Sequence, residues 1–209
     1  MELNNKQIEF LNKFAKDKWV LNEETGLVDI DGNFYCNDKK LKDFKGILFG
    51  EVKGNFYCHN NSLTSLVGSP QKVVGAFICR NNKLKSLVGS PQEVGGNFNC
   101  SYNKLTSLDG APKKIGGSFN CSYNKITSLE GAPRYITQCL IFEYNPISVK
   151  TLNLVWKTMQ KSKVDYVGAL LILNKKIPNG YWSKMVRGYE DKITQEAIKI
   201  YSIVSRYSL

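Results

Sequence analysis

Apolar residues recur along the middle of the chain at steps of 21 residues. Each copy reads Phe-x-Cys-x-x-Asn-x-Leu-x-x-Leu and is followed by Gly-x-Pro. The copies begin at Phe56, Phe77, Phe98 and Phe119, and an earlier copy begins 22 residues before the first of these, at Phe34. A degenerate last copy contains Leu140, Phe142, Asn145 and Ile147. A fixed period of this size predicts a repeat architecture.

The alternation within the repeat predicts how each coil folds. Phe-x-Cys has a period of two, which predicts a short strand with Phe and Cys on the core side. Gly and Pro in the return leg exclude a long helix and favour extended chain or short turns, with one further inward column of Val52, Val73, Val94, Ile115 and Ile136. We expect each repeat Asn to bond the backbone of the neighbouring coil. The fold predicted for residues 32–147 is a solenoid of about six coils.

The first 31 residues lack the repeat and predict an N-terminal cap. Residues 1–18 have helical spacing of apolar residues, and Asn4 or Asn5 is positioned as the helix cap. Residues 19–30 predict a hairpin in which Trp19 and Leu21 face Val28 and Ile30. Because a solenoid end exposes apolar core and strand edges, a different unit is expected there.

Residues 148–209 also lack the repeat and predict an α-helical C-terminal subdomain that caps the other end. Ser148 is a plausible helix cap for residues 148–161, an apolar segment at 167–172 ends in Lys175-Lys176, and residues 190–207 have helical spacing. The whole chain is therefore predicted to be an α+β solenoid with a cap at each end.

The repeat resembles the leucine-rich repeat, with Phe and Cys in two of the Leu positions. The stretch Leu63-Thr64-Ser65-Leu66-Val67-Gly68-Ser69-Pro70 is similar to the short bacterial type found in secreted effectors, and Gly-Asn-Phe-x-Cys-x-x-Asn is similar to repeats encoded in bacteriophage genomes. The segment from Asn145 to Leu152 resembles the end of such arrays. Some of these effectors are ubiquitin ligases with a catalytic cysteine after the array, but no cysteine follows Cys139, so we do not expect that activity.

Composition and charge indicate whether the chain folds, where it is located and which partners it attracts. The chain has 209 residues, of which 42% are hydrophobic and 11% aromatic, and this favours a folded protein. It has no apolar run long enough for a membrane span and no signal-peptide pattern at its start, so we expect a cytoplasmic protein. The resemblance of the repeats implies a bacterium or a phage-infected cell as its setting. The net charge of +11 favours acidic partners in general.

The cysteines and the single histidine are the first candidates for chemistry. Five cysteines share one inward repeat position, which predicts a buried ladder of thiols as core filler. The alternatives are metal binding, disulfides or redox sensing, but no Cys-x-x-Cys pair occurs. His59 adjoins Cys58 on the outward side of its strand, where a catalytic pair would require an exposed thiol. We expect no enzymatic activity, no cofactor and no metal.

Outward positions of the strands, which we expect to form a concave face, and a tyrosine column beside them form the candidate protein-binding surface. Tyrosine and arginine on a rigid surface give large contact area at low entropy cost. The candidate residues are Tyr35, Tyr57, His59, Arg80, Asn99, Tyr102, Asn120, Tyr123, Glu143 and Tyr144. The alternative is that the polar residues only solvate the face and that the tyrosines only stabilise one another.

A possible second contact site lies in the basic C-terminal part, at Tyr181, Trp182, Lys184 and Arg187. The favoured function is protein binding by occupancy, and the resemblance to phage repeats suggests inhibition of a host bacterial protein such as a defence factor. The alternatives are nucleic-acid binding through the basic aromatic C-terminal part, or a structural, virion-associated role.

Overall fold

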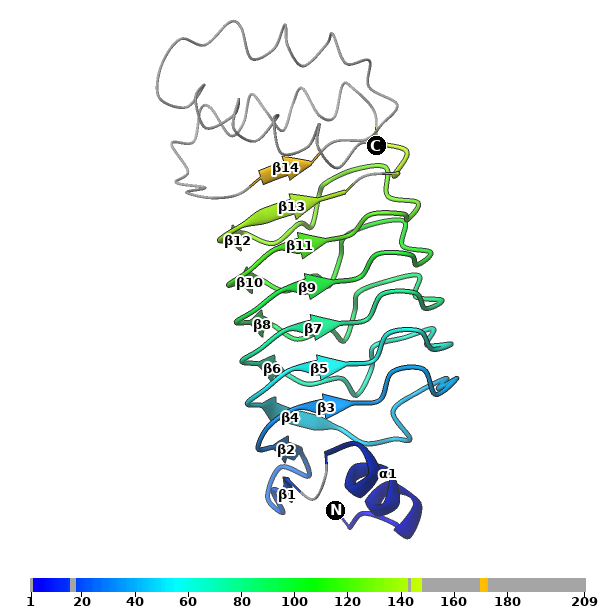
Figure 1. The fold of residues 1–209 in the computed structure, drawn as a ribbon, viewed down its shortest axis with the longest axis vertical. Coiled ribbons are helices and arrows are strands. Elements are labelled where there is room, and N and C mark those ends of the chain that lie inside the picture. The colour runs from blue at the N-terminus through cyan, green and yellow to red at the C-terminus, as the bar shows by residue number, and fades with distance from the viewer. Residues whose placement is uncertain (1, 16–17, 143, 148–169, 173–209) are drawn as a thin grey trace, which may run out of the picture.

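The computed structural model describes residues 2–15, 18–142, 144–147 and 170–172. The chain forms a β-solenoid of about five turns of roughly 21 residues, and the described residues include one α-helix, at the N-terminal end. Two parallel sheets run along the solenoid, because each turn contributes a short strand to each sheet (Figure 1). The repeat predicted from the sequence is therefore confirmed as a solenoid.

One sheet carries the Phe column and is called the Phe sheet here. Its strands are β3 (Phe34–Tyr35), β5 (Phe56–Tyr57), β7 (Phe77–Ile78), β9 (Phe98–Asn99), β11 (Phe119–Asn120), β13 (Cys139–Ile141) and β14 (Leu170–Ile172). From β3 to β13 the strands pair in parallel and in register, so that each Phe lies beside the Phe or Leu of the next turn.

The other sheet carries the Val and Ile column and is called the Val sheet. Its strands are β1 (Trp19–Leu21), β2 (Val28–Ile30), β4 (Phe49–Val52), β6 (Lys72–Val73), β8 (Glu93–Val94), β10 (Lys114–Ile115) and β12 (Tyr135–Ile136). Most of these strands span two residues, too short to show an alternating pattern, so the sequence predicted the inward column but not a second sheet.

The core between the sheets is a set of stacked columns. The Phe rings from Phe34 to Phe98 lie face to face, with centroids 5.1 Å apart between Phe34 and Phe56 and 5.5 Å apart between Phe56 and Phe77, while the Phe119 ring is tilted by 55° from that of Phe98. In each two-residue strand of the two sheets, one residue is buried in the core. The Leu columns close the third side of the core. Burial of one such large apolar side chain contributes about 1.5–3 kcal/mol, so the repeated columns supply most of the stabilisation.

The buried asparagine column behaves as the sequence predicted. In Asn103, Nδ2 donates to the carbonyl oxygens of Cys79 (3.1 Å) and Cys100 (3.0 Å), and Oδ1 accepts from the amide of Leu84 (3.0 Å). Each side chain therefore joins its own turn to the preceding one where the chain leaves the Phe sheet. The same pattern recurs at Asn82, Asn124 and Asn145.

A helix covers the N-terminal end of the Phe sheet. Helix α1 (Asn5–Ala15) is capped by Asn4, whose Oδ1 accepts from the amide of Gln7 (3.1 Å) while Gln7 Oε1 accepts from the amide of Asn4 (3.0 Å). The rings of Phe10 and Phe14 lie 5.9 and 6.0 Å from that of Phe34. The predicted helix is thus confirmed, within tighter bounds.

The predicted hairpin is also confirmed, and it extends the Val sheet. Strand β1 pairs antiparallel with β2, with Trp19 opposite Ile30 and Leu21 opposite Val28, and β2 pairs in parallel with β4 of the first turn. Trp19 Nε1 donates to Asn12 Oδ1 (2.7 Å), which ties the hairpin to the helix. At the N-terminal end, α1 therefore lies against the Phe sheet, whereas β1 and β2 extend the Val sheet (Figure 1).

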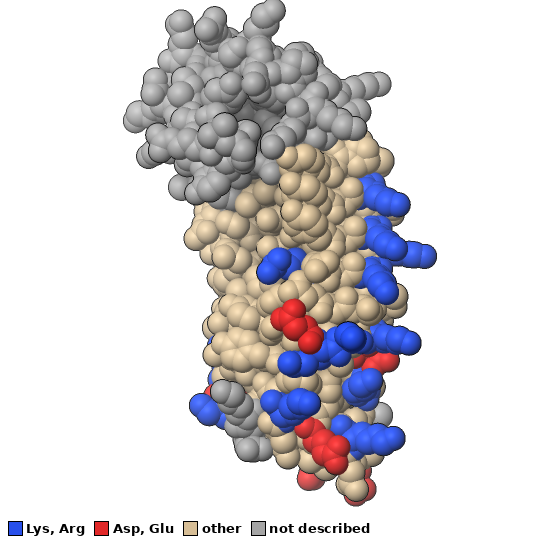
Figure 2. Space-filling view, turned by 45° about the vertical axis from the view of Figure 1, so that its right-hand side comes forward, with Lys and Arg blue, Asp and Glu red and all other residues tan. Residues whose placement is uncertain are grey.

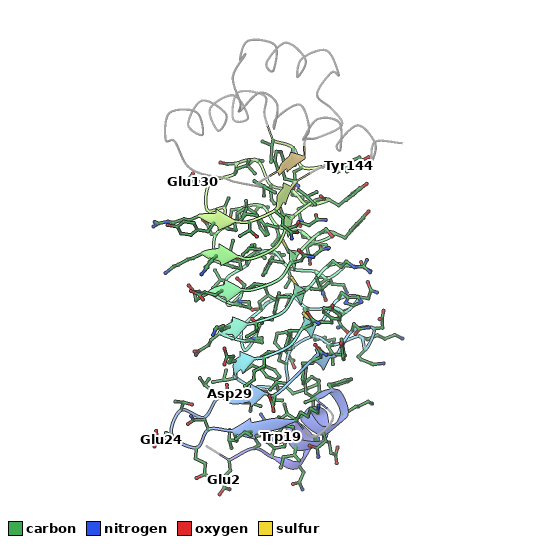
Figure 3. The ribbon with its side chains drawn as sticks, turned by 60° about the vertical axis from the view of Figure 1, so that its left-hand side comes forward. Glu2, Trp19, Glu24, Asp29, Glu130 and Tyr144 are labelled. Carbon is green, nitrogen blue, oxygen red and sulfur yellow. The ribbon has the colours of Figure 1, made fainter. Side chains whose placement is uncertain are left out.

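Two expectations need correction. The segment 167–172 was expected to be helical, but Leu170–Ile172 is strand β14, which pairs in parallel with β13. A short apolar run suits either structure, and the edge of β13 offers unpaired backbone groups to an extended segment. The outer face of the Phe sheet was expected to be concave, whereas its strands stack in a nearly straight column (Figures 1 and 3). The helices expected at 148–161 and 190–207 lie outside the described residues.

Candidate protein-binding surface

Four predicted contact residues gather on the outer face of the Phe sheet near the N-terminal end. The rings of Tyr35 and Tyr57 meet edge to face at 5.2 Å, and the Tyr57 ring lies 6.0 Å from the imidazole of His59. Tyr35 and Arg80 are exposed, and the two rings between them are half-buried. We call these four residues, Tyr35, Tyr57, His59 and Arg80, the strand-face patch.

The surroundings of His59 favour the neutral form of its ring. Its Nδ1 is buried and has no hydrogen-bond partner among the described residues. Burial lowers the pKa of His59 and the positive charge of Arg80 lowers it further, while Asp38 opposes them. The neighbouring Cys58 side chain is fully buried on the opposite side of the strand, so the two residues do not form a nucleophile pair.

The side chains of Asn99 and Asn120 form hydrogen bonds within their own turns. Asn99 Oδ1 accepts from the amide (3.0 Å) and the hydroxyl (2.7 Å) of Ser101, and Asn120 Oδ1 accepts from the amide of Ser122 (3.0 Å). Both side chains are half-buried. They shape the face, and they have less capacity left for a partner than the tyrosines have.

The predicted tyrosine column is a continuous stack beside the Phe sheet. Ring centroids of Tyr102 and Tyr123 are 4.2 Å apart with planes 10° from parallel, and those of Tyr123 and Tyr144 are 4.1 Å apart at 18°. All three residues have left-handed backbones, with φ of 55°, 54° and 54°. Hydrogen bonding of its phenol with Tyr144, and burial and hydrogen bonding with Tyr102, raise the pKa of Tyr123. Figure 3 shows Tyr144 at the edge of the array.

A lysine column runs beside these tyrosines and was missed as a site by the sequence analysis. Lys83, Lys104 and Lys125 are exposed, and the amides of Lys104 and Lys125 donate to the carbonyls of Leu84 and Leu105 of the preceding turns (both 2.8 Å). Figure 2 shows Lys and Arg side chains projecting along one edge of the array. The signal was present in the sequence, because these lysines recur every 21 residues, directly after the buried asparagines.

The five repeat cysteines are confirmed as core. Cys36, Cys58, Cys79, Cys100 and Cys121 are free thiols with no exposed surface. Burial raises the pKa of Cys36 and of Cys121 to about 12, so these thiols stay protonated and unreactive at neutral pH. Within the described part of the chain, no group of three or more His, Cys, Asp or Glu is placed to hold a metal ion.

Several predicted site residues lie outside the part of the chain that the structure describes. They are Glu143 of the outer face and the possible second contact site of Tyr181, Trp182, Lys184 and Arg187. In the ranges that are described, no helix is both long and apolar enough to cross a membrane.

In comparisons with known proteins, the chain matches no protein-family model, no curated protein and no solved structure. The roles of the surface residues therefore rest on the geometry and chemistry described above.

Proposed function

We propose that the chain is a non-enzymatic protein-binding module that acts by occupancy, blocking or tethering its partner. The observation that carries this proposal is the strand-face patch, where two tyrosines, a neutral histidine and an exposed arginine adjoin on one flat sheet face. Tyr and Arg are the side chains that most often anchor protein interfaces.

Rigidity of the face supports this function. The backbone amides of Phe56 and Cys58 donate to the carbonyls of Ala76 and Ile78 of the next turn, at 2.8 and 2.9 Å, and equivalent bonds recur along the sheet. A surface held by such a ladder loses little conformational entropy when a partner binds.

The residue pattern of the repeats supports a more specific proposal about the type of repeat and the origin of the protein. We propose that the solenoid belongs to the leucine-rich-repeat type, that residues 148–209 form a helical subdomain apart from strand β14, and that the protein comes from a bacterium or phage. The target would then be a host bacterial protein, for example a defence factor, met in the cytoplasm.

A quantitative capture experiment tests the function. The immobilised full chain is incubated with a bacterial extract, and captured proteins are quantified by mass spectrometry. The patch variant Tyr57→Ala with Arg80→Glu is compared with Tyr135→Ala with Lys114→Glu, which likewise removes one tyrosine and reverses one basic charge, at exposed positions of the Val sheet. We expect a partner that the patch variant loses at least tenfold and the control variant retains.

The same samples separate protein binding from nucleic-acid binding. If capture disappears after nuclease treatment, or if the chain binds generic DNA and RNA tightly with a steep decrease in salt, the nucleic-acid alternative replaces the proposal. If both variants lose the same proteins equally, the strand-face patch is not the binding site.

A further inference from the structure

The left-handed turn after the Phe sheet is occupied in two different ways along the array. In the first three coils it holds Asp38, Asn60 and Asn81, with φ between 53° and 59°. Their side chains form a polar ladder, in which Asn60 Nδ2 donates to Asp38 Oδ1 (2.8 Å) and Asn81 Nδ2 donates to Asn60 Oδ1 (2.9 Å). Asn and Asp are the residues, besides Gly, that suit this backbone conformation. The fold therefore closes this turn without an aromatic residue.

The next three coils place Tyr at the same backbone position. A left-handed conformation strains a residue such as Tyr, and the attraction within an aromatic pair is similar in size to that strain. Three strained residues and two ring pairs give no clear gain in stability. Residues held in such strained conformations cluster at binding sites, because a surrounding rigid structure maintains them for function.

The spacing of the rings determines what can bind. Centroids 4.1–4.2 Å apart leave no room for a nucleotide base between the rings, because an inserted plane needs about 7 Å. The ring edges carry the phenol groups, and since the phenol of Tyr123 hydrogen-bonds those of Tyr144 and Tyr102, the three hydroxyls form one hydrogen-bonded row along the axis of the solenoid.

The lysine column supplies charge beside this row. Each lysine follows its turn residue by two positions, so the Cα atoms of Tyr102 and Lys104 lie within about 7 Å. Lys104 and Lys125 are exposed, and the ion pairs within the described residues use other lysines, namely Lys45, Lys53 and Lys72. Phenols and ammonium groups side by side are complementary to carboxylates.

We propose that this ridge, formed by Tyr102, Tyr123 and Tyr144 with Lys83, Lys104 and Lys125, binds an extended acidic segment of a protein partner. The inference rests on the proposed protein-binding function and names the chemistry of the partner. The four coils from Lys83 to Tyr144 span about 14 Å, and an extended segment presents same-side carboxylates about 6.6 Å apart, so two or three Glu or Asp side chains fit along the ridge. Three lysines are fewer than the 6–10 phosphate contacts of typical DNA-binding proteins, which favours the peptide.

Fluorescence anisotropy with a labelled oligoglutamate peptide tests the proposal on the full chain at low salt. We expect Lys104→Glu with Lys125→Glu to weaken binding at least about tenfold. The control, Lys113→Glu with Lys114→Glu, makes the same change in net charge at exposed positions near and on the Val sheet, and should weaken binding less than about threefold. Tyr123→Asn restores the residue type that Asn60 and Asn81 already use, so it keeps the fold and should weaken binding about fivefold.

Three outcomes would overturn the proposal: no binding of oligoglutamate by the wild type, equal losses in the two lysine variants, or tighter binding of single-stranded DNA of equal charge through the same lysines. These results are distinct from failure of the proposed function. A partner captured through Tyr57 and Arg80, together with wild-type behaviour of the ridge variants, would refute the ridge alone.

Discussion

Two neighbouring residue columns of the solenoid differ in how much their residue type varies from turn to turn. The inward column, buried or half-buried, is Asn in every turn from Asn61 to Asn145, whereas the more exposed column directly before it changes from Asn to Tyr. A buried Asn saturates backbone groups of two coils, and no other side chain offers the same two donors and one acceptor in that volume. In the column before it, Asn60 and Asn81 instead bond the side chain at the same position of the preceding coil.

This difference separates the positions that build the solenoid from those that carry its recognition. Inside, each side chain repeats because one backbone geometry repeats. Outside, the same geometry supports an amide ladder in one half and an aromatic stack in the other, so the array varies its surface while its core stays constant.

The largest expected effect concerns the other interior column, the thiols. For Cys36 and Cys121 the pKa is raised by burial from 9.0 to about 12. Above pH 9 the unfolded chain releases thiol protons that the folded chain retains, so stability is full below pH 9 and is lost as the pH rises toward 12. We expect a loss of about 1.4 kcal/mol per buried thiol for each pH unit above 9. Urea unfolding followed from neutral to alkaline pH measures it.

The variant Cys121→Ala identifies the origin of that loss. Removing one of the buried thiols should reduce the slope of stability against pH by about 1.4 kcal/mol per unit, even though the cavity lowers stability at all pH values. An unchanged slope would assign the alkaline loss to lysines and tyrosines on the surface.

The adjacent pair Asn82 and Asn81 compares the two columns directly. Asn82→Ala leaves the carbonyls of Cys58 and Cys79 and the amide of Leu63 without their partner, and should lower the free energy of unfolding by about 3 kcal/mol or more. Asn81→Ala loses an exposed hydrogen bond and should cost about 1 kcal/mol, mainly from its left-handed backbone. Denaturant titration of both variants measures the difference. Equal losses in the free energy of unfolding would mean that the two columns contribute equally to stability.

Tyr123→Asn should have a smaller effect. The lost stacking and the relieved backbone strain nearly offset each other, so we expect the free energy of unfolding to change by less than about 1 kcal/mol. Thermal unfolding of this variant provides the measurement. A loss well above 2 kcal/mol would make the aromatic stack a structural element rather than a surface for recognition.

The smallest effect is spectroscopic. Since hydrogen bonding with Tyr144 and Tyr102 raises the pKa of Tyr123, its phenolate should form above the pH at which ordinary tyrosines ionise. Absorbance of the phenolate against pH should show a late component that is absent in Tyr123→Phe. Identical curves for the two proteins would mean that the phenols do not interact.

Much of the fold could be predicted, because residues at the same position of each repeat occupy the same structural environment. Phe77, Cys79, Leu84 and Leu87 are all fully buried, as their spacing indicated, and Asn82 makes the predicted bonds between coils. The Val sheet was missed as a sheet, because two residues such as Glu93 and Val94 carry no periodic signal. The strand at Leu170–Ile172 was missed because pairing with β13, a contact distant in sequence, decides its conformation.

The candidate site could be predicted only in part. The outward positions and the tyrosine stack follow from the register, so their placement was available from the period alone. The left-handed backbone of Tyr102 and Tyr123 was not, since Tyr has no preference for it and the turn around the buried Asn imposes it. The lysine column was visible as a repeat, yet its proximity to the phenols depends on that turn.

The two-part N-terminal cap has a consequence for assembly. Parallel strands stacked in register form a template onto which further chains can add without limit, as they do in fibres. Here α1 lies against β3 and the antiparallel strand β1 reverses the direction of the Val sheet, so neither sheet offers a parallel end at that side. The Trp19–Asn12 hydrogen bond links the helix to the hairpin. The cap therefore leaves no parallel strand at this end onto which the strands of another copy could add in register.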